Sequence, residues 1–204
     1  MQYGMVIDLS RCVGCNSCTL ACKVSNGTPP AMFFSHVDIE EQGTYPDAMN
    51  IYTPTLCMHC TEAPCVENCP TGASYRDENG IVRISHADCI GCQACVSACP
   101  YGARTHLSED IAGYYPEFGL TEQEEVMYGR FETNKVYKCD FCRSKGLVDS
   151  EQGPACVQSC PGKARIFGDL DDPNSEVSQL IASGEYTQIG EEFGTSPNVY
   201  YLAR

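Results

Sequence analysis

Long apolar segments are missing from this sequence of 204 residues. No run approaches the roughly 18 apolar residues that a membrane helix needs, so we expect no direct membrane span. The opening residues 1–8 contain neither the basic region nor the apolar region of a secretion signal. We therefore expect either a cytoplasmic chain or one that is exported together with a signal-bearing partner, and the sequence leaves both open.

Positive charge is also scarce, because 13 Lys and Arg residues stand against 27 Asp and Glu residues. The formal net charge is −14 at pH 7. Nucleic acid and anionic membrane surfaces are therefore not expected as direct partners, since both repel such a protein. The length suffices for one domain of ordinary size or for two small ones.

Motifs for bond-making chemistry are absent. The sequence contains no G-x-G-x-x-G, no P-loop, no C-x-x-C-H and no arrangement of Ser, His and Asp in a catalytic context. The four histidines are scattered, and His59 lies between two cysteines, where we expect a hydrogen-bonding role rather than metal ligation. We therefore predict no catalytic residues and a chain that is not an enzyme by itself.

Cysteine, in contrast, is abundant, and its sixteen copies fall into four quartets with none left over. The third quartet, which runs from Cys89 to Pro100, has the spacing C-x2-C-x2-C-x3-C-P of bacterial iron–sulfur proteins. Gly91 allows a tight loop in which three thiolates can take three corners of one cluster. The quartets are Cys12, Cys15, Cys18, Cys22; Cys57, Cys60, Cys65, Cys69; Cys89, Cys92, Cys95, Cys99; and Cys139, Cys142, Cys156, Cys160.

Two other uses of sixteen cysteines are conceivable. A secreted disulfide framework is compatible with an even number of cysteines, but such scaffolds are mostly much shorter than this chain. Structural zinc sites usually use two separated C-x2-C pairs instead of a continuous run. Iron–sulfur clusters are therefore the leading interpretation, and a structural zinc protein is the remote alternative.

Strand-forming residues precede two cysteine loops and indicate an internal repeat. Met5–Ile7 comes before the first quartet and Ile81–Ile84 before the third. Asn79 and Gly80 lie between two β-rich pieces and predict a hairpin that joins the second quartet to the third. Ala164–Phe167, after the fourth quartet, is predicted to be a strand that pairs with the N-terminal one.

Helices and loops are expected in other segments. Thr121 and Glu124 have capping-box spacing and predict a short surface helix. A second helix is predicted over Glu176–Ala182. Residues 24–56 contain several Gly and Pro and are expected to be irregular, with one short strand at Phe33–Ile39.

The spacing also predicts which cysteines share a cluster. In two-cluster ferredoxins the fourth cysteine of each run ligates the cluster built on the other run. The second and third quartets lie close in sequence and pair by this rule, and by elimination the first pairs with the fourth. The predicted ligand sets are Cys12, Cys15, Cys18 and Cys160 for cluster 1; Cys22, Cys139, Cys142 and Cys156 for cluster 2; Cys57, Cys60, Cys65 and Cys99 for cluster 3; and Cys69, Cys89, Cys92 and Cys95 for cluster 4.

The predicted fold class is α+β, with two bacterial-ferredoxin-like dicluster units, one inserted in the other, and with irregular loops and a C-terminal tail. The acidic segment 107–134 is either a docking lobe or a solvated helix that covers a small core, and the sequence leaves both open. The outer unit is residues 1–28 plus 135–170, the inner unit is residues 52–106, residues 29–51 are a connection, residues 107–134 an acidic insertion, and residues 171–204 a C-terminal docking tail.

Five cations lie close to predicted ligands in the sequence and could offset cluster charge, which would raise the potentials of particular clusters. The alternative is that they are surface residues that keep the protein soluble. These cations are Lys23, Arg104, Lys138, Arg143 and Lys163.

The order and spacing of the quartets resemble those of the iron–sulfur electron-transfer subunit of the dimethyl sulfoxide reductase family of molybdopterin oxidoreductases. The second quartet reads C-M-H-C-x4-C-x3-C-P, the third C-I-G-C-x2-C-x3-C-P, and the fourth K-C-D-F-C followed by G-P-A-C-x3-C-P. The resemblance covers residues 1–168 and extends to the closing P-N-V-Y-Y-L. The chain departs from compact members of the family in its acidic insertion.

This resemblance implies particular cofactors and partners. It implies four 4Fe–4S clusters, because all four cysteines of the third quartet are present where some relatives carry a tryptophan. It also implies electron transfer between a molybdenum or tungsten bis-pterin catalytic subunit and a quinone-reactive membrane subunit or another redox partner. The alternative function is a free-standing soluble polyferredoxin that serves several partners.

Overall fold

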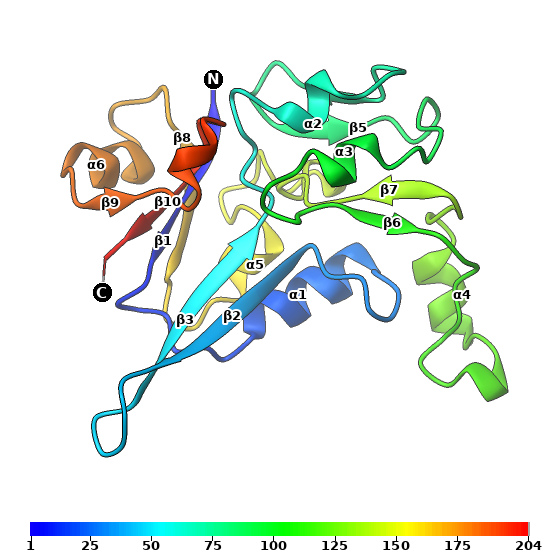
Figure 1. Ribbon diagram of the computed structural model, residues 1–204, viewed down its shortest axis with the longest axis horizontal. Coiled ribbons are helices and arrows are strands. Elements are labelled where there is room, and N and C mark those ends of the chain that lie inside the picture. The colour runs from blue at the N-terminus through cyan, green and yellow to red at the C-terminus, as the bar shows by residue number, and fades with distance from the viewer. Residues whose placement is uncertain (204) are drawn as a thin grey trace.

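The computed structural model describes residues 1–203, and its largest sheet brings together the beginning, the later part and the end of this range. The strand order is β8-β1-β10-β9 (Figure 1). β1 pairs antiparallel with β8, which confirms the predicted pairing, and parallel with β10. The strands are β1 (Tyr3–Asp8), β8 (Arg165–Asp169), β9 (Tyr186–Thr187) and β10 (Val199–Leu202).

β1 is buried on both faces, which explains its continuous apolar run. Met5 and Ile7 belong to the main core, whereas Val6 packs on the other face with Ile166 and Val177. Val177 lies on α6 (Glu176–Ala182), a helix whose bounds agree with the prediction. The segment after residue 170 thus covers one face of the sheet with α6 and adds β9 and β10 to it, and its role as a docking tail stays a prediction.

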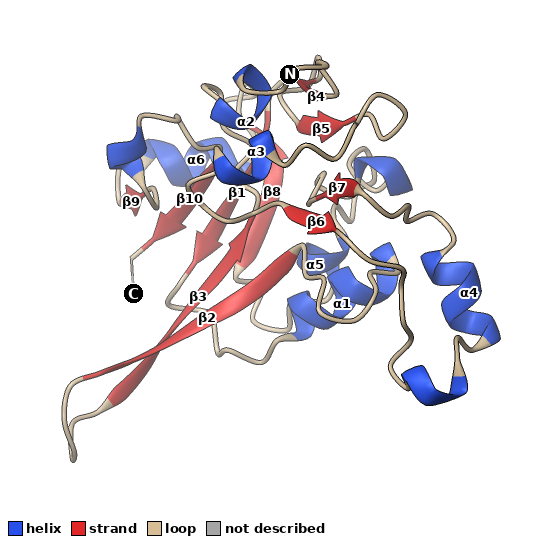
Figure 2. Cartoon of the chain, turned by 45° about the vertical axis from the view of Figure 1, so that its right-hand side comes forward, coloured by secondary structure: helices blue, strands red, loops and turns tan. Residues whose placement is uncertain are grey.

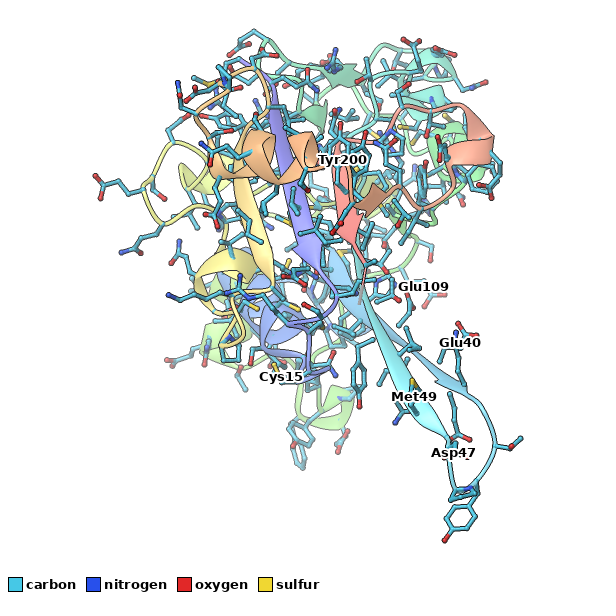
Figure 3. All side chains as sticks on the ribbon, turned by 90° about the vertical axis from the view of Figure 1, so that its left-hand side faces the viewer. Cys15, Glu40, Asp47, Met49, Glu109 and Tyr200 are labelled. Atoms are coloured by element: carbon cyan, nitrogen blue, oxygen red, sulfur yellow. The ribbon has the colours of Figure 1, made fainter. Side chains whose placement is uncertain are left out.

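A long hairpin replaces the irregular connection that was expected within residues 24–56. β2 (Ser35–Gln42) and β3 (Met49–Leu56) pair antiparallel along their whole length. β2 overlaps the predicted strand at Phe33–Ile39 but is longer, and β3 was not predicted. The pairing satisfies the backbone groups of both strands although many of their side chains are exposed. Figure 2 shows the far end of the hairpin projecting away from the body, and Figure 3 labels Asp47 at this end.

Two short antiparallel ladders lie beside the second and third quartets. The first ladder is the predicted hairpin, in which Gly80 adopts a φ of +76° in the turn. The second ladder lies at the two ends of residues 107–134. This segment therefore leaves the body after β6 and returns to it at β7, the strand that pairs with β6. The strands are β4 (Ser74–Arg76), β5 (Val82–Ile84), β6 (Thr105–Leu107) and β7 (Lys135–Tyr137).

The helices are short, and three of them comprise a single turn within a cysteine run. Within residues 1–203, no helix is long and apolar enough to cross a membrane. The α-helices other than α6 are α1 (Ser17–Asn26), α2 (Pro64–Glu67), α3 (Ala94–Ser97), α4 (Glu122–Tyr128) and α5 (Ala155–Gln158), and the 3₁₀ turns are η1 (Pro116–Phe118), η2 (Arg143–Lys145) and η3 (Glu191–Phe193).

The surface helix predicted after Thr121 is present as α4. The Glu124 N–H donates to Thr121 Oγ1 over 3.3 Å, and the Thr121 N–H donates to Glu124 Oε2 over 2.9 Å. This reciprocal pair is the predicted capping box, which satisfies two amides at the start of the helix.

Cysteine side chains make up much of the interior. Nine of the sixteen are buried, five are half-buried, and Cys15 and Cys92 are exposed. Eight of the nine buried cysteines share the main core with Met58, Phe141 and residues of the strands β1 and β5. The core is therefore arranged around the predicted ligands rather than beside them.

Candidate metal centres

One cavity between α1 and the fourth quartet gathers the thiols predicted for cluster 2. Its lining includes Cys22, Cys139, Cys142 and Cys156. Cys22 reaches it from α1 and Cys156 from α5, because these two helices pack against each other. Burial, followed by the charges of Cys156 and Cys142, raises the pKa of Cys22 to about 12. A metal group here would have to displace the protons of its ligands.

A second cavity gathers the thiols predicted for cluster 1. Its lining includes Cys12, Cys15 and Cys18 of the first quartet and Cys160 of the fourth. Gly14 and Asn16 adopt positive φ angles in this loop, which lets three thiols of one short run face the same space. Figure 3 shows Cys15 beside the N-terminal end of α1.

The thiols predicted for cluster 3 lie within electrostatic reach of one another. Burial raises the pKa of Cys60 to about 11, with further contributions from Cys57, Cys65 and Cys99. Cys65 lies on α2, which packs against α3 of the third quartet (Figure 1). The contact between these helices brings Cys99, which follows α3, close to the second quartet.

The thiols predicted for cluster 4 come from the two sides of the β4–β5 hairpin. Cys69 precedes β4 and accepts a hydrogen bond of 3.3 Å from the Ser74 N–H. Although burial opposes the shift, this hydrogen bond and those from Thr71 lower the pKa of Cys69. The other three thiols belong to the loop and helix α3 of the third quartet, and their sharing of a cluster with Cys69 stays a prediction.

The thiols line the walls of shared spaces rather than meeting at one point. Within residues 1–203, no group of three or more His, Cys, Asp or Glu side chains is arranged to hold a single metal ion. The two cavities described above instead have four cysteines each in their lining. Four cysteines around one cavity match the cysteine ligation of a 4Fe–4S cluster.

Buried donors without partners provide a test of whether a cluster fits. In the described part of the chain, His59 Nε2 and Arg104 Nε and Nη1 have no hydrogen-bond partner. His59 is fully buried, its Nδ1 accepts from the Val82 N–H over 3.1 Å, and its ring stacks on Phe141 with centroids 3.8 Å apart. Unpaired buried donors are costly, and the sulfides of a cluster are acceptors that would satisfy them. The donor set therefore fits an iron–sulfur cluster.

The predicted cations differ in what they contact. Arg104 Nη2 donates to Cys65 Sγ over 3.0 Å. Lys138 Nζ donates to the carbonyl oxygens of Val82 and Cys139. Arg104 thus contacts the thiol of a predicted ligand directly, whereas Lys138 is held by backbone carbonyl oxygens.

Two other predicted cations donate to oxygen atoms rather than to thiols. Lys23 Nζ donates to the carbonyl oxygens of Pro29 and Met32 over 2.7 and 3.2 Å. Arg143 pairs with Asp149 over 3.0 Å. Lys163 lines a surface pocket.

Two further residues lie beside the thiols, Asn26 and Arg165, and neither was predicted from the sequence. Asn26 Nδ2 donates to Cys22 Sγ over 3.5 Å and lies 3.9 Å from Cys142 Sγ. Asn26 lies four residues after Cys22 on α1, and this helical spacing was the available signal. Arg165 is buried beside Cys156. The available sequence signal was that Arg165 stands five positions after Cys160, as Arg104 stands five positions after Cys99.

Comparison with known proteins gives matches across the chain. Residues 48–111 match a 4Fe-4S dicluster domain, and residues 9–25 match a 4Fe-4S binding domain. The chain is 41% identical to the arsenate respiratory reductase iron-sulfur subunit ArrB of Shewanella sp. (strain ANA-3), over 99% of this chain and 96% of that protein. It is 42% identical to a subunit of the selenate reductase of Mesobacillus selenatarsenatis, over 99% and 72%. It is 39% identical to a subunit of the sulfite dehydrogenase of Allochromatium vinosum, over 100% and 83%.

Proposed function

The chain belongs to the family of iron–sulfur electron-transfer subunits of molybdopterin oxidoreductases, and we propose that it carries electrons through four 4Fe–4S clusters. The proposed clusters have the ligand sets predicted from the sequence. Each contains three cysteines of one quartet and one cysteine of another. The chain itself is not catalytic, because the redox chemistry of the clusters consists of one-electron transfer.

The observation that carries this proposal is the mixed lining of the two cavities. One cavity is lined by three cysteines of the fourth quartet together with Cys22 of the first. The other is lined by three cysteines of the first quartet together with Cys160 of the fourth. This exchange of the fourth cysteine between two runs is the arrangement of two-cluster ferredoxins.

The electrostatic effects between the ligand sets support one spatial order of the four clusters. Burial, and to a smaller extent neighbouring thiols, raise the pKa of Cys156. One of these thiols is Cys18, so a ligand of cluster 2 lies near a ligand of cluster 1. Burial, followed by thiols that include Cys57, raises the pKa of Cys139, which relates cluster 2 to cluster 3. Arg104 lies near thiols of both clusters 3 and 4. We infer the order 1, 2, 3, 4.

The exposed thiols support the same order. Cys15 of cluster 1 and Cys92 of cluster 4 are the two exposed cysteines among the sixteen. The exposed side chains of Val13 and Ile90 lie in the same two loops. The proposed ends of the wire therefore reach the surface where a redox partner can approach, whereas clusters 2 and 3 are enclosed.

The unit arrangement and the partners complete the proposal. Residues 52–106 form the inner dicluster unit, supported by the dicluster-domain match, within an outer unit of residues 1–28 and 135–170. Residues 29–51, 107–134 and 171–204 are the connection, the acidic insertion and the docking tail. The subunit passes electrons between a molybdopterin catalytic subunit with Mo or W and a quinone-reactive membrane subunit or another redox partner.

Metal analysis and reconstitution test this function. The protein purified without oxygen should contain about sixteen iron atoms and as many acid-labile sulfides per chain. Its clusters should exchange electrons with the co-expressed molybdopterin subunit when that subunit's substrate is added: they should be reduced by an oxidisable substrate or, once reduced, reoxidised by a reducible one. Zinc in place of iron would overturn the proposal, and a chain that keeps its clusters as a monomer beside the co-expressed subunit would favour the polyferredoxin.

A further inference from the structure

A short repeat follows the last cysteine of two quartets. Residues 99–104 read C-P-Y-G-A-R and residues 160–165 read C-P-G-K-A-R, so an arginine stands five positions after the cysteine in both. Residues 69–74 read C-P-T-G-A-S and carry Ser74 at the equivalent position. One C-P-x2-A-R sequence belongs to the inner pair of quartets and the other to the outer pair.

Arg104 is buried between the thiols of two ligand sets. Its side chain is 4% exposed, and its Nη2 donates to Cys65 Sγ over 3.0 Å and to Ser74 Oγ over 2.7 Å. Although burial opposes the shift, the charges of Cys65, Cys57 and Cys95 raise the pKa of Arg104. The guanidinium therefore lies beside cluster 3 and cluster 4 and is held by a serine from β4.

Arg165 repeats this arrangement in the outer pair. It is 3% exposed, its Nη2 donates to Ser35 Oγ over 3.0 Å, and its Nη1 lies 3.9 Å from Met5 Sδ. It lines the cavity that also contains Cys18 and Cys160 of cluster 1. Although burial opposes the shift, the charges of Cys156 in cluster 2 and Cys18 in cluster 1 raise the pKa of Arg165. Its anchor, Ser35, is the first residue of β2 and is itself 1% exposed.

Neither guanidinium has an acidic partner. Within residues 1–203, the ion pairs of arginine involve Arg143 alone, so Arg104 and Arg165 are buried cations without a carboxylate. A buried charge of this kind is strongly unfavourable unless an opposite charge compensates it. Arg104 Nε and Nη1 additionally have no hydrogen-bond acceptor in this part of the chain. Anionic clusters on both sides would supply the charge and the acceptors.

We propose that Arg104 and Arg165 are positioning residues for electron transfer, each clamped by a serine between the two clusters of one dicluster unit, where it makes both clusters easier to reduce. Adding an electron increases the negative charge of a cluster, and a fixed cation in a low-dielectric interior stabilises the reduced form more than the oxidised form. The inference rests on the proposed four-cluster function, because it assumes two clusters around each arginine.

Redox titration followed by electron paramagnetic resonance tests the inference on the complete protein. Arg104→Gln, which keeps a hydrogen-bond donor and removes the charge, should shift the potentials of clusters 3 and 4 to more negative values. Arg165→Gln should shift clusters 1 and 2 instead. Arg104→Lys should recover most of the loss, although an ammonium cannot reproduce the planar fork of the guanidinium.

Arg83→Gln is the matched control, because it removes the same charge from β5, where the guanidinium lies 6.0 Å from the Tyr75 ring. It should shift no cluster as far as Arg104→Gln does. Should an Arg104 variant lose iron, Ser74→Ala, which keeps the cation and removes its anchor, should give a smaller negative shift of clusters 3 and 4.

Two results would overturn the inference. One is an Arg104→Gln protein with full iron content and unchanged potentials, and the other is a shift no larger than that of Arg83→Gln. If the arginine variants do not assemble with iron, a Ser74→Ala protein with unchanged potentials of clusters 3 and 4 would also overturn the inference. A protein without about sixteen iron atoms would instead contradict the proposed function itself.

Discussion

Cys99 is the last cysteine of its own run, yet its proposed cluster is built on another run. We expect Cys99→Ser to damage cluster 3, because Cys57, Cys60 and Cys65 lose their fourth ligand. The loop from Cys89 to Cys95 keeps its three ligands to cluster 4. Electron paramagnetic resonance of the reduced protein should show that the cluster 3 signal is lost or altered. Iron analysis should show a lower iron content per chain.

Cys69→Ser is the matched variant for this prediction, since it removes the fourth ligand from cluster 4 and leaves cluster 3 complete. The two variants should therefore lose different signals. If Cys99→Ser removes the same signal as a change in the Cys89 loop, the exchange of fourth cysteines between runs is wrong.

Gly91 is the second residue whose substitution has a predictable effect, because its backbone angle and a close neighbouring atom both oppose a side chain. Its φ is +71°, and an added Cβ would lie 2.1 Å from the Asn134 carbonyl oxygen. Gly91→Ala must therefore displace the cysteine loop from Asn134, the residue before β7, as well as accept a strained φ, and we expect loss of cluster 4. Gly102→Ala is the control, since Gly102 has a φ of +59° with no atom within 4 Å of its added Cβ.

The strain alone should cost Gly102→Ala about 1 kcal/mol of folding free energy and leave its clusters in place. Iron content and the visible absorbance of the two variants measure the difference. Equal cluster contents in both would show that the contact with Asn134 does not matter.

Single residues near the ligands could be predicted only where sequence proximity coincides with contact. Arg104 is five residues after Cys99, but the thiol that it touches is Cys65 of another run. Arg165 is likewise held by Ser35, 130 positions away. Side-chain partners of this kind depend on tertiary packing, which local spacing does not encode.

At the scale of elements, α4 allows a test that separates local stability from the clusters. Thr121→Ala removes the side chain that caps the helix, and such losses cost about 1 kcal/mol. We expect faster amide hydrogen exchange in α4 and unchanged cluster signals, because the helix lies in the insertion and not at a ligand. Gln123→Ala, inside the same helix, leaves the cap intact and should have little effect.

An opposite outcome would be informative about the insertion. If Thr121→Ala alters cluster potentials or iron content, α4 helps to hold the metal sites. Lost binding to the catalytic subunit with intact clusters would instead support the docking role of residues 107–134.

Elements with local signals were predicted well. The hairpin of β4 and β5 has Asn79 and Gly80 in its turn, and α6 has Ser175 as a cap whose Oγ accepts from the Ser178 N–H. β2 and β3 lacked such a signal, because many of their side chains are exposed and because a proline such as Pro54 argues against a strand in the sequence. The parallel pairing of β10 with β1 is also a tertiary contact between sequence ends, which the tail's composition does not reveal.

At the scale of the whole molecule, the buried cysteines share one core with the apolar side chains. The one-turn helices α2, α3 and α5 have four residues each and lie within the cysteine runs. Isolated helices shorter than about 12 residues are marginal in water, so these turns depend on what they pack against. In this chain they pack against other cysteine-bearing elements, as α1 does against α5 and α2 against α3.

Iron removal should therefore unfold the cluster-binding regions first. Burial raises the pKa of Cys139 and Cys156, so their free thiols would be neutral, and four such groups would leave a cavity without its contents. We expect α2, α3 and α5 to exchange their amide hydrogens at rates near those of an unfolded chain. The sheet around β1, where Val6 packs on Val177 of α6, should retain protection longer.

Hydrogen exchange with mass spectrometry, after anaerobic chelation of iron, measures this order. Protein taken through the same treatment without chelator is the control for damage by handling. Protection in α2, α3 and α5 that survives complete iron removal would show that side-chain packing alone holds the ligand geometry. Loss of protection confined to these helices would show instead that the same bonds that place the clusters for electron transfer also fold the chain around them.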